Sequence, residues 1–220
     1  MVTTVYLIRH CESEGNITEI FQGHYDGDVT PKGQLQLDKL AERCKDIPFD
    51  VIYASPLKRA YKTAEAVNRY HSLPIHKETG IMEINGGDME GHRWDKLDDL
   101  FPEENKKWKT DFCNFQAPYG ESVRDVYKRM KDTVLRIVSE NKGKTIGLFS
   151  HGGAIRIFSC FAHGLPVERI DEMLWCDNTA INCYEFDDNL TPKVVFENSC
   201  EHINGDESTK AHQLWWKDEK

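Results

Sequence analysis

Two arginines and two histidines occur at or just beyond the ends of three short apolar runs in this chain. Arg9 and His10 end the first run. Arg59 lies shortly after the second run, and His151 follows the third. Guanidinium groups bind phosphate oxygens in pairs, and a neutral imidazole can attack phosphorus through one nitrogen if an acceptor such as a backbone carbonyl holds the other as a donor. These residues therefore predict phosphoryl chemistry, with the arginines as an anion clamp and the histidines left for the other roles.

Cleavage of a phosphate ester also needs an acid for the departing oxygen. The segment 81–91 carries carboxylates in an apolar stretch bounded by glycines. We predict that Glu83 is the acid, because burial in such a loop would raise its pKa enough for it to donate a proton near neutrality. Glu90 and Asp88 are the alternatives.

The three apolar runs, 5–8, 51–54 and 146–149, are β-rich and are separated by helical stretches. This arrangement predicts parallel strands joined by helices, and an open parallel sheet binds its ligand at the carboxyl ends of its strands. The residues after the runs would then meet at one edge. We expect an α/β fold, a three-layer sandwich with a mostly parallel sheet flanked by helices and a small helical cover over the carboxyl edge.

Helix-start signals precede the expected crossover helices. Thr30-Pro31 predicts one start, and Ser55-Pro56 predicts another that would place Arg59 about one turn into its helix. Apolar residues at helical spacing over 123–138 predict a helix before the third run. The first helix should bury a stripe made of Leu35, Leu37, Leu40, Ala41 and Cys44.

The segment 72–120 is the least regular part of the chain, and we expect it to form short helices as a cover over the sheet edge. Two later runs, 181–186 and 194–196, predict a hairpin at one side of the sheet. Five aromatic residues of the cover would form its own small core or border the pocket and select the leaving group. They are Trp94, Phe101, Trp108, Phe112 and Phe115.

The length of 220 residues predicts one catalytic domain over 1–203, with the cover inside it, followed by a polar tail over 204–220. We expect the tail to be mobile unless Leu214, Trp215 and Trp216 dock it onto the body.

Composition excludes several classes of function. A net charge of -9 argues against a nucleic-acid binder, which needs a clustered basic surface. No apolar run approaches the roughly 18 residues that span a bilayer, and no export signal is visible, so we expect no membrane association. Seven cysteines without a C-x-x-C pair predict reduced thiols in a cytoplasm. The histidines show no metal-ligand spacing, so no metal is expected.

Several motifs follow one another along the chain: Arg9-His10-Cys11-Glu12-Ser13 with Asn16, Ser55-Pro56-Leu57-Lys58-Arg59-Ala60 with Thr63-Ala64, Glu83 before Gly91, Gly120-Glu121-Ser122, and Ser150-His151-Gly152-Gly153. In this order they resemble the histidine phosphatase superfamily, in the branch of phosphoglycerate mutases and small-molecule phosphatases. The resemblance covers nearly the whole chain. It implies that His10 becomes the phosphohistidine and that Glu83 donates the proton. It also implies phosphoryl binding by Arg9, Arg59 and His151, without a metal or other cofactor.

The same resemblance implies further pocket residues. Positions that line the pocket in relatives are matched by Ser13, Asn16, Gln22 and Gly23. The amide of Gly152 would add a hydrogen-bond donor at a helix start. Additional candidates from the sequence are His24, Tyr25 and Arg93. Glu121-Ser122 is interpreted as a helix-start device.

Cys11 stands where the family usually has glycine. Either the turn does not require a positive φ, or the loop is altered, and a thiol at this position predicts sensitivity to oxidation. Cys11 is also the reason to consider a phosphate-binding pseudophosphatase as an alternative to an enzyme.

The residues after Glu83 distinguish a phosphatase from a mutase within the family. Mutases of the family tend to carry Glu-Arg-His-Tyr-Gly there, whereas this chain has Glu83-Ile84-Asn85-Gly86-Gly87-Asp88, which is more similar to Glu-x-x-x-Gly-x-x-Glu-Gly of the phosphatases. The resemblance therefore implies a metal-independent phosphomonoesterase that hydrolyses a small phosphorylated metabolite through a phosphohistidine. A phosphoglycerate mutase is the alternative.

Overall fold

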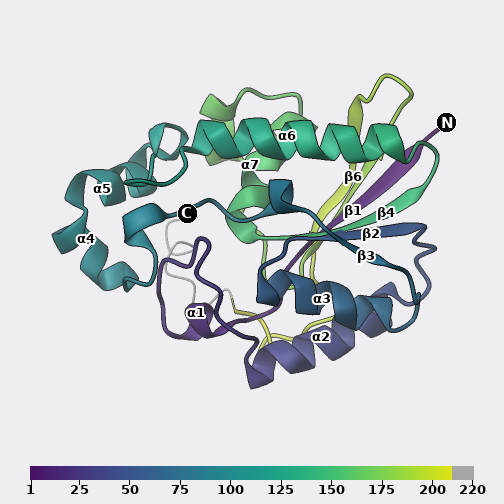
Figure 1. The fold of residues 1–220 in the computed structure, drawn as a ribbon, viewed down its shortest axis with the longest axis horizontal. Coiled ribbons are helices and arrows are strands. Elements are labelled where there is room, and N and C mark those ends of the chain that lie inside the picture. The colour runs from purple at the N-terminus through teal and green to yellow at the C-terminus, as the bar shows by residue number, and fades with distance from the viewer. Residues whose placement is uncertain (210–220) are drawn as a thin grey trace.

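The computed structural model describes residues 1–209, which form a six-stranded sheet in the order β3-β2-β4-β1-β5-β6 (Figure 1). Parallel pairing joins the first four strands of this order, whereas the last two pair antiparallel. The predicted mostly parallel sheet is therefore confirmed. The strands are β1 (Thr3–Arg9), β2 (Val51–Ala54), β3 (Ile75–Lys77), β4 (Thr145–Ser150), β5 (Ile181–Phe186) and β6 (Pro192–Ser199).

Helices cover both faces of the sheet. One cluster of buried side chains joins the sheet to α6 and α7, and another joins it to α2 and α3, which lie on the opposite side (Figure 1). Side chains of successive strand residues point to opposite faces, so Leu7 belongs to the first cluster and Ile8 to the second. The helices are α1 (Glu14–Ile17), α2 (Pro31–Cys44), α3 (Lys58–Asn68), α4 (Leu97–Leu100), α5 (Pro102–Thr110), α6 (Val123–Glu140) and α7 (Gly152–Ala162).

Two details of the helices differ from the predictions. Leu35 is 57% exposed, because its position lies on the opposite face of α2 from the buried stripe of Leu37, Leu40 and Ala41. Arg59 is the second residue of α3 and does not lie one turn into it. The helix begins late because Leu57, with ψ of 132°, keeps the chain extended after Pro56.

The strand register places the predicted catalytic segments side by side. In the parallel pairing of β1 with β4, Arg9 lies opposite Ser150, and in the pairing of β2 with β4, Ala54 lies opposite Phe149. Since β4 lies between β1 and β2, the residues that follow these three strands meet at one edge.

The segment 72–120 contains α4, α5 and several single turns of 3₁₀ helix, as expected for a cover, and its first part also supplies the edge strand β3, which the sequence did not predict. Figure 1 shows α4 and α5 beyond the carboxyl ends of the strands. The hairpin of β5 and β6 at one side of the sheet matches its prediction.

The beginning of the predicted tail contacts the body of the protein. Thr209 is 1% exposed, and its hydroxyl lies within hydrogen-bond distance of the side-chain oxygens of Asp177, at 2.7 Å, and Asn178. Glu207 forms an ion pair with Lys39 at 2.6 Å. The proposed docking through Leu214, Trp215 and Trp216 lies outside the described residues.

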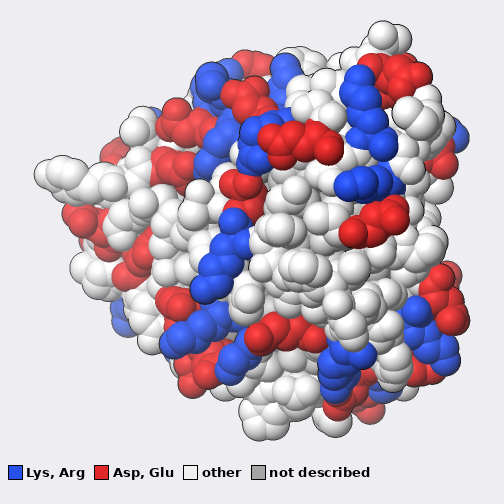
Figure 2. Space-filling model, turned by 45° about the vertical axis from the view of Figure 1, so that its right-hand side comes forward, with Lys and Arg blue, Asp and Glu red and all other residues white. Residues whose placement is uncertain are grey.

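Charged side chains of both signs are interspersed on the face shown in Figure 2. The protein also has exposed ion pairs, such as Arg136 with Glu140 at 3.2 Å, which contribute little to stability. Within residues 1–209, no helix combines the length and the apolar character needed to cross a bilayer.

Candidate active site

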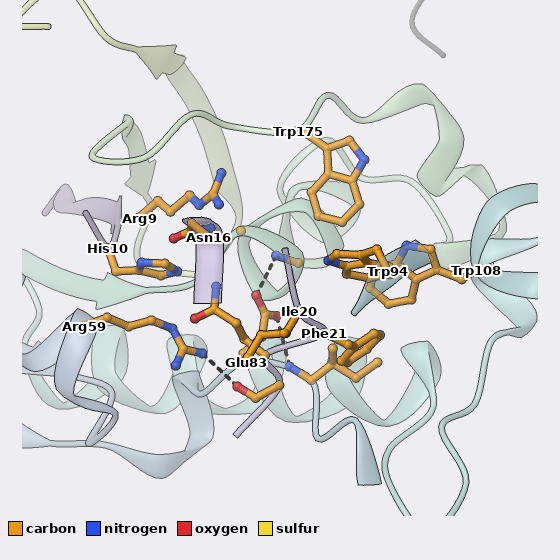
Figure 3. A pocket seen from close by; sticks show the side chains of 15 residues that line it. Arg9, His10, Asn16, Ile20, Phe21, Arg59, Glu83, Trp94, Trp108 and Trp175 are labelled. Carbon is orange, nitrogen blue, oxygen red and sulfur yellow. Dashed lines mark hydrogen bonds between the residues drawn. The ribbon is translucent and has the colours of Figure 1, made fainter. Parts of the chain in front are cut away.

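A pocket opens at the carboxyl edge of the sheet (Figure 3). Four of the five predicted catalytic residues line it, namely Arg9, His10, Arg59 and Glu83. The fifth, His151, lies next to His10, with 5.2 Å between the ring centroids, but does not line the pocket. The structure therefore brings together all five of the predicted side chains.

His10 is held by its backbone and by its ring. Its amide donates to the carbonyl of Ser150 at 3.0 Å, and its own carbonyl accepts from the side chain of Asn178 at 2.9 Å. The ring atom Nδ1 lies 2.6 Å from the carbonyl oxygen of Cys11, which can only accept, so Nδ1 carries the proton. Cys11 thus supplies the acceptor that a nucleophilic imidazole needs, and Nε2 of the neutral ring keeps its lone pair.

The environment of His10 favours the neutral ring. Burial lowers its pKa well below 6.5, and the positive charges of Arg59 and Arg9 act in the same direction. An imidazole that stays neutral at physiological pH has an unprotonated nitrogen with which to attack phosphorus.

Arg59 is 1% exposed and is oriented by two backbone carbonyls. Its two terminal nitrogens donate to Tyr25 and Gly23, each at 2.8 Å. Burial lowers its pKa from 12.5 to about 10, so it remains a cation at neutral pH. Arg9 is 3% exposed and donates to the carbonyl of Cys176. The two guanidinium groups are therefore ordered before any anion binds.

His151 lies directly before α7 and is fully buried. Its Nε2 lies 2.8 Å from the hydroxyl of Ser55, which follows β2. Burial, with the nearby charge of Arg59, lowers its pKa well below 6.5. A neutral His151 avoids charge repulsion with His10 if that ring becomes cationic.

Glu83 occupies the N-terminus of α7. Its carboxylate accepts hydrogen bonds from the amides of Gly153 at 3.0 Å and Ala154 at 2.9 Å. A Cβ at position 153 would lie 2.7 Å from the Oε1 atom of Glu83, so glycine is needed there for the carboxylate to approach the helix. The helix end thus holds Glu83 at the pocket wall.

The alternative carboxylates have other positions. Glu90 does not line the pocket, and its Oε1 accepts from the amides of His24 at 2.7 Å and Gly86 at 2.8 Å. Asp88 is exposed on the surface. The positions of the three carboxylates therefore favour Glu83 as the acid over Glu90 and Asp88.

Four of the five predicted binding residues line the pocket, and they are Asn16, Gln22, Gly23 and Gly152. Ser13 does not line the pocket, and it donates to the Oε1 atom of Gln22 at 2.8 Å. The lining does not include the additional candidates His24, Tyr25 and Arg93.

Arg129 was not singled out in the sequence, yet it holds the segment of Glu83. Its guanidinium donates to the carbonyls of Met82 and Glu83, each at 2.8 Å, and to both carboxylate oxygens of Glu121. Glu121 also accepts from the amide of Asn85 at 2.9 Å. Glu121 thus stabilises the loop that carries Glu83. The adjacent Ser122 caps α6 as predicted.

The pocket also contains a residue for which the sequence offered no signal. Trp175 lies in the loop between α7 and β5, far along the chain from the cover, and lines the pocket together with Trp94 and Trp108. An isolated tryptophan in a loop has no periodicity or motif that would assign it to a site.

Within residues 1–209, no three His, Cys, Asp or Glu side chains are grouped so that they could hold a metal ion. The carboxylate of Asp177 lies 2.7 Å from the hydroxyl of Thr209. The Nε2 atom of His202 lies 3.0 Å from the hydroxyl of Thr179.

Comparison with known proteins places this arrangement in a family. Residues 5–199 match the histidine phosphatase superfamily (branch 1). The chain belongs to the histidine phosphatase superfamily. This membership confirms the resemblance and the class of enzyme predicted from the motifs.

Individual relatives of this histidine phosphatase have different activities in their names. "Phosphoserine phosphatase 1" of Hydrogenobacter thermophilus is 29% identical over 210 residues, which cover 94% of this chain and 97% of that protein. A "2,3-bisphosphoglycerate-dependent phosphoglycerate mutase" of Bartonella tribocorum is 31% identical, with 77% and 86% covered. A crystal structure of a phosphoserine phosphatase mutant from Entamoeba histolytica in complex with phosphoserine is 28% identical, with a TM-score of 0.81 and coverage of 92% and 100%.

The stability of this histidine phosphatase should depend on its buried neutral histidines. The unfolded chain binds a proton on each near pH 6.5, whereas the folded protein does so only at lower pH. We therefore expect the free energy of unfolding to fall as pH decreases below 6.5, by about 1.4 kcal/mol per pH unit for each such histidine. Urea unfolding of the wild type and His151→Gln at several pH values between 7.5 and 4.5 would measure this slope.

The control for that measurement is His163→Gln, since His163 lies at the surface and pairs with Glu197 at 2.8 Å. The slope should be reduced in His151→Gln and unchanged in His163→Gln. Equal slopes in all three proteins would contradict the assignment.

Cys11 should be structural and chemically inert. It does not have a positive φ, so the turn after His10 does not require glycine in this histidine phosphatase. Its side chain is fully buried beside Leu37 and Ala66, and burial raises the pKa of the thiol to about 12. A buried, protonated thiol reacts poorly with oxidants, which argues against the predicted oxidation sensitivity.

We therefore expect Cys11→Ala to lower the free energy of unfolding by about 1 kcal/mol through lost packing and to leave kcat within about twofold of the wild type. Urea unfolding and steady-state kinetics measure the two quantities. Mild peroxide should inactivate the wild type no faster than the variant. Faster loss in the wild type would identify Cys11 as a reactive thiol.

Proposed function

We propose that this chain is a metal-independent phosphomonoesterase that hydrolyses a small phosphorylated metabolite through a phosphohistidine at His10. The observation that carries the proposal is the hydrogen bond from Nδ1 of His10 to the carbonyl of Cys11. It leaves the unprotonated Nε2 as the nucleophile in a pocket that also holds Arg9, Arg59 and Glu83. The phosphatase names among the relatives support the same reaction.

In the first step the two arginines bind the phosphoryl oxygens, and Nε2 of His10 attacks phosphorus as the bond to the leaving oxygen breaks. Protonated Glu83 transfers its proton to that oxygen. The ring of His10 becomes cationic, and the carbonyl of Cys11 stabilises this charge because it accepts a hydrogen bond from the protonated Nδ1.

In the second step water replaces the leaving group. The carboxylate of Glu83 takes a proton from the water, whose oxygen forms a bond to phosphorus as the bond to Nε2 breaks. Phosphate leaves, and His10 returns to its neutral form. The same two residues thus serve both halves of the reaction.

A phosphoglycerate mutase is the second candidate, favoured by the mutase among the relatives. It would transfer the phosphoryl group from His10 to a second hydroxyl and release no phosphate. The cytoplasmic location predicted from the scattered cysteines remains a prediction.

The test is phosphate release from p-nitrophenyl phosphate, O-phosphoserine and other small esters in the presence of EDTA. Wild-type protein mixed with substrate and rapidly denatured at alkaline pH should also gain the mass of one phosphoryl group, located on His10. Release that requires an added divalent metal would refute the proposal. Conversion of 3-phosphoglycerate to 2-phosphoglycerate without phosphate release would favour the mutase.

A further inference from the structure

The two ends of the pocket differ in chemistry. Figure 3 shows Arg9, His10 and Arg59 on one side and three tryptophans on the other, with Glu83 between them. A phosphoryl group bound to the arginines would direct its ester oxygen past Glu83, and the leaving group would extend toward the tryptophans. The wall that they form is made of Trp94, Trp108 and Trp175, and Phe21, which also lines the pocket, packs against Trp94 and Trp108.

These tryptophans are not simply the core of the cover. Phe112 and Phe115 are 3% and 0% exposed and fill that core. The three tryptophans are only half-buried, and their rings contact one another, with centroid distances of 5.3 Å between Trp94 and Trp108 and 6.3 Å between Trp108 and Trp175. They therefore present aromatic surface to the pocket.

Neighbouring side chains hold the wall in position. Trp108 packs edge-on against Phe112 and Phe115, at centroid distances of 4.7 Å and 4.9 Å. The guanidinium of Arg156 lies 4.7 Å from the centre of the Trp175 ring, and its Nε donates to the carbonyl of Met173 at 2.8 Å. A wall that is already ordered loses little conformational entropy when a ring stacks on it.

Charge disfavours a carboxylated leaving group. Among the described residues that line the pocket, the cations are Arg9 and Arg59, and both serve the phosphoryl group. A carboxylate on the leaving group would lie near Glu83 and the tryptophans. Arg156 does not line the pocket, and it faces Asp171 at 3.7 Å.

Resting on the proposed phosphatase function, we propose that the leaving group of the substrate carries a flat, uncharged ring that stacks on Trp94, Trp108 and Trp175. The pocket lining runs from the two arginines to the tryptophans, so one ligand with a phosphoryl group and such a ring would contact both ends. The ring could belong to an aryl compound or to a nucleoside, since both offer an aromatic face to tryptophan.

The first measurement compares 2-phenylethyl phosphate with ethyl phosphate, because both have alkyl leaving groups and differ mainly in the ring. We expect kcat/KM to be about tenfold higher for the phenyl compound. The kcat/KM for 2-phenylethyl phosphate should also exceed the kcat/KM for O-phosphoserine and for 3-phosphoglycerate. A nucleoside 5′-monophosphate in the same series identifies which source of the ring is preferred.

The second measurement replaces one tryptophan. Trp175→Leu should reduce the ratio of kcat/KM between the phenyl and ethyl esters about tenfold. Phe161→Leu is the control, because Phe161 is a half-buried aromatic residue that does not line the pocket. In Phe161→Leu the ratio of kcat/KM between the phenyl and ethyl esters should equal that of the wild type.

Binding of phenylphosphonate and methylphosphonate, measured by calorimetry, separates the ring site from catalysis. Tenfold tighter binding of phenylphosphonate supports the ring site even if no ester is hydrolysed. In that case the proposed phosphatase function would be wrong, and the ring site would stand. Hydrolysis with a preference for O-phosphoserine, or equal ratios in the wild type and Trp175→Leu, would overturn the ring proposal and leave the phosphatase intact.

Discussion

Replacing His10 with alanine should lower kcat for every phosphate ester by a factor of about 10⁴ to 10⁶. The variant lacks the Nε2 atom that attacks phosphorus in the proposed reaction, and no other imidazole lines the pocket within the described residues. His151, the nearest alternative, lies behind His10 and bonds to Ser55. Phosphate release by the purified variant, with the intact mass of the denatured protein, measures both turnover and the phosphoryl-enzyme.

The control is His163→Ala, which removes a surface histidine outside the pocket and should retain wild-type kcat. Urea unfolding of both variants shows whether lost activity reflects a lost fold. His10→Ala should still bind phosphate, because Arg9 and Arg59 are held by the carbonyls of Cys176, Tyr25 and Gly23. A folded His10→Ala variant with a tenth or more of the wild-type turnover would eliminate the phosphohistidine route.

Glu83→Gln should lower kcat about 10² to 10⁴-fold for an alkyl phosphate, because glutamine cannot supply the proton that the departing alkoxide needs. For p-nitrophenyl phosphate the loss in the phosphorylation step should be much smaller, since that leaving group departs without a proton. Gly153 and Ala154 donate to different carboxylate oxygens, so glutamine keeps one of these two hydrogen bonds and loses the other, and urea unfolding of the variant checks that the fold is retained. Rapid-quench kinetics with both esters measures the phosphorylation step.

Glu90→Gln tests the alternative assignment of the acid. The carboxylate of Glu90 bonds to the amides of His24 and Gly86 outside the pocket lining, so its loss should affect both esters equally. If Glu90→Gln showed the dependence on the leaving group and Glu83→Gln did not, Glu90 would be the acid.

The sheet edge that carries Arg9, His10 and His151 could be predicted because it depends on local signals. Three short β-rich runs predicted parallel strands, and the pairing of Arg9 with Ser150 and of Ala54 with Phe149 aligns their ends. Strand β3 was missed because three residues, of which two are exposed, show no alternation that a sequence pattern could reveal.

The chemistry of the sheet edge was thus determined by the sequence alone, because residues that follow parallel strands must meet wherever those strands pair. The tertiary structure decided what depends on contacts between distant segments. These contacts give Glu83, and not Glu90, the amides of α7, and they bring Trp175 beside Trp94 and Trp108. They also decide that His10 and His151 are buried beside Arg59, because burial and charge depend on the neighbours of a side chain in space.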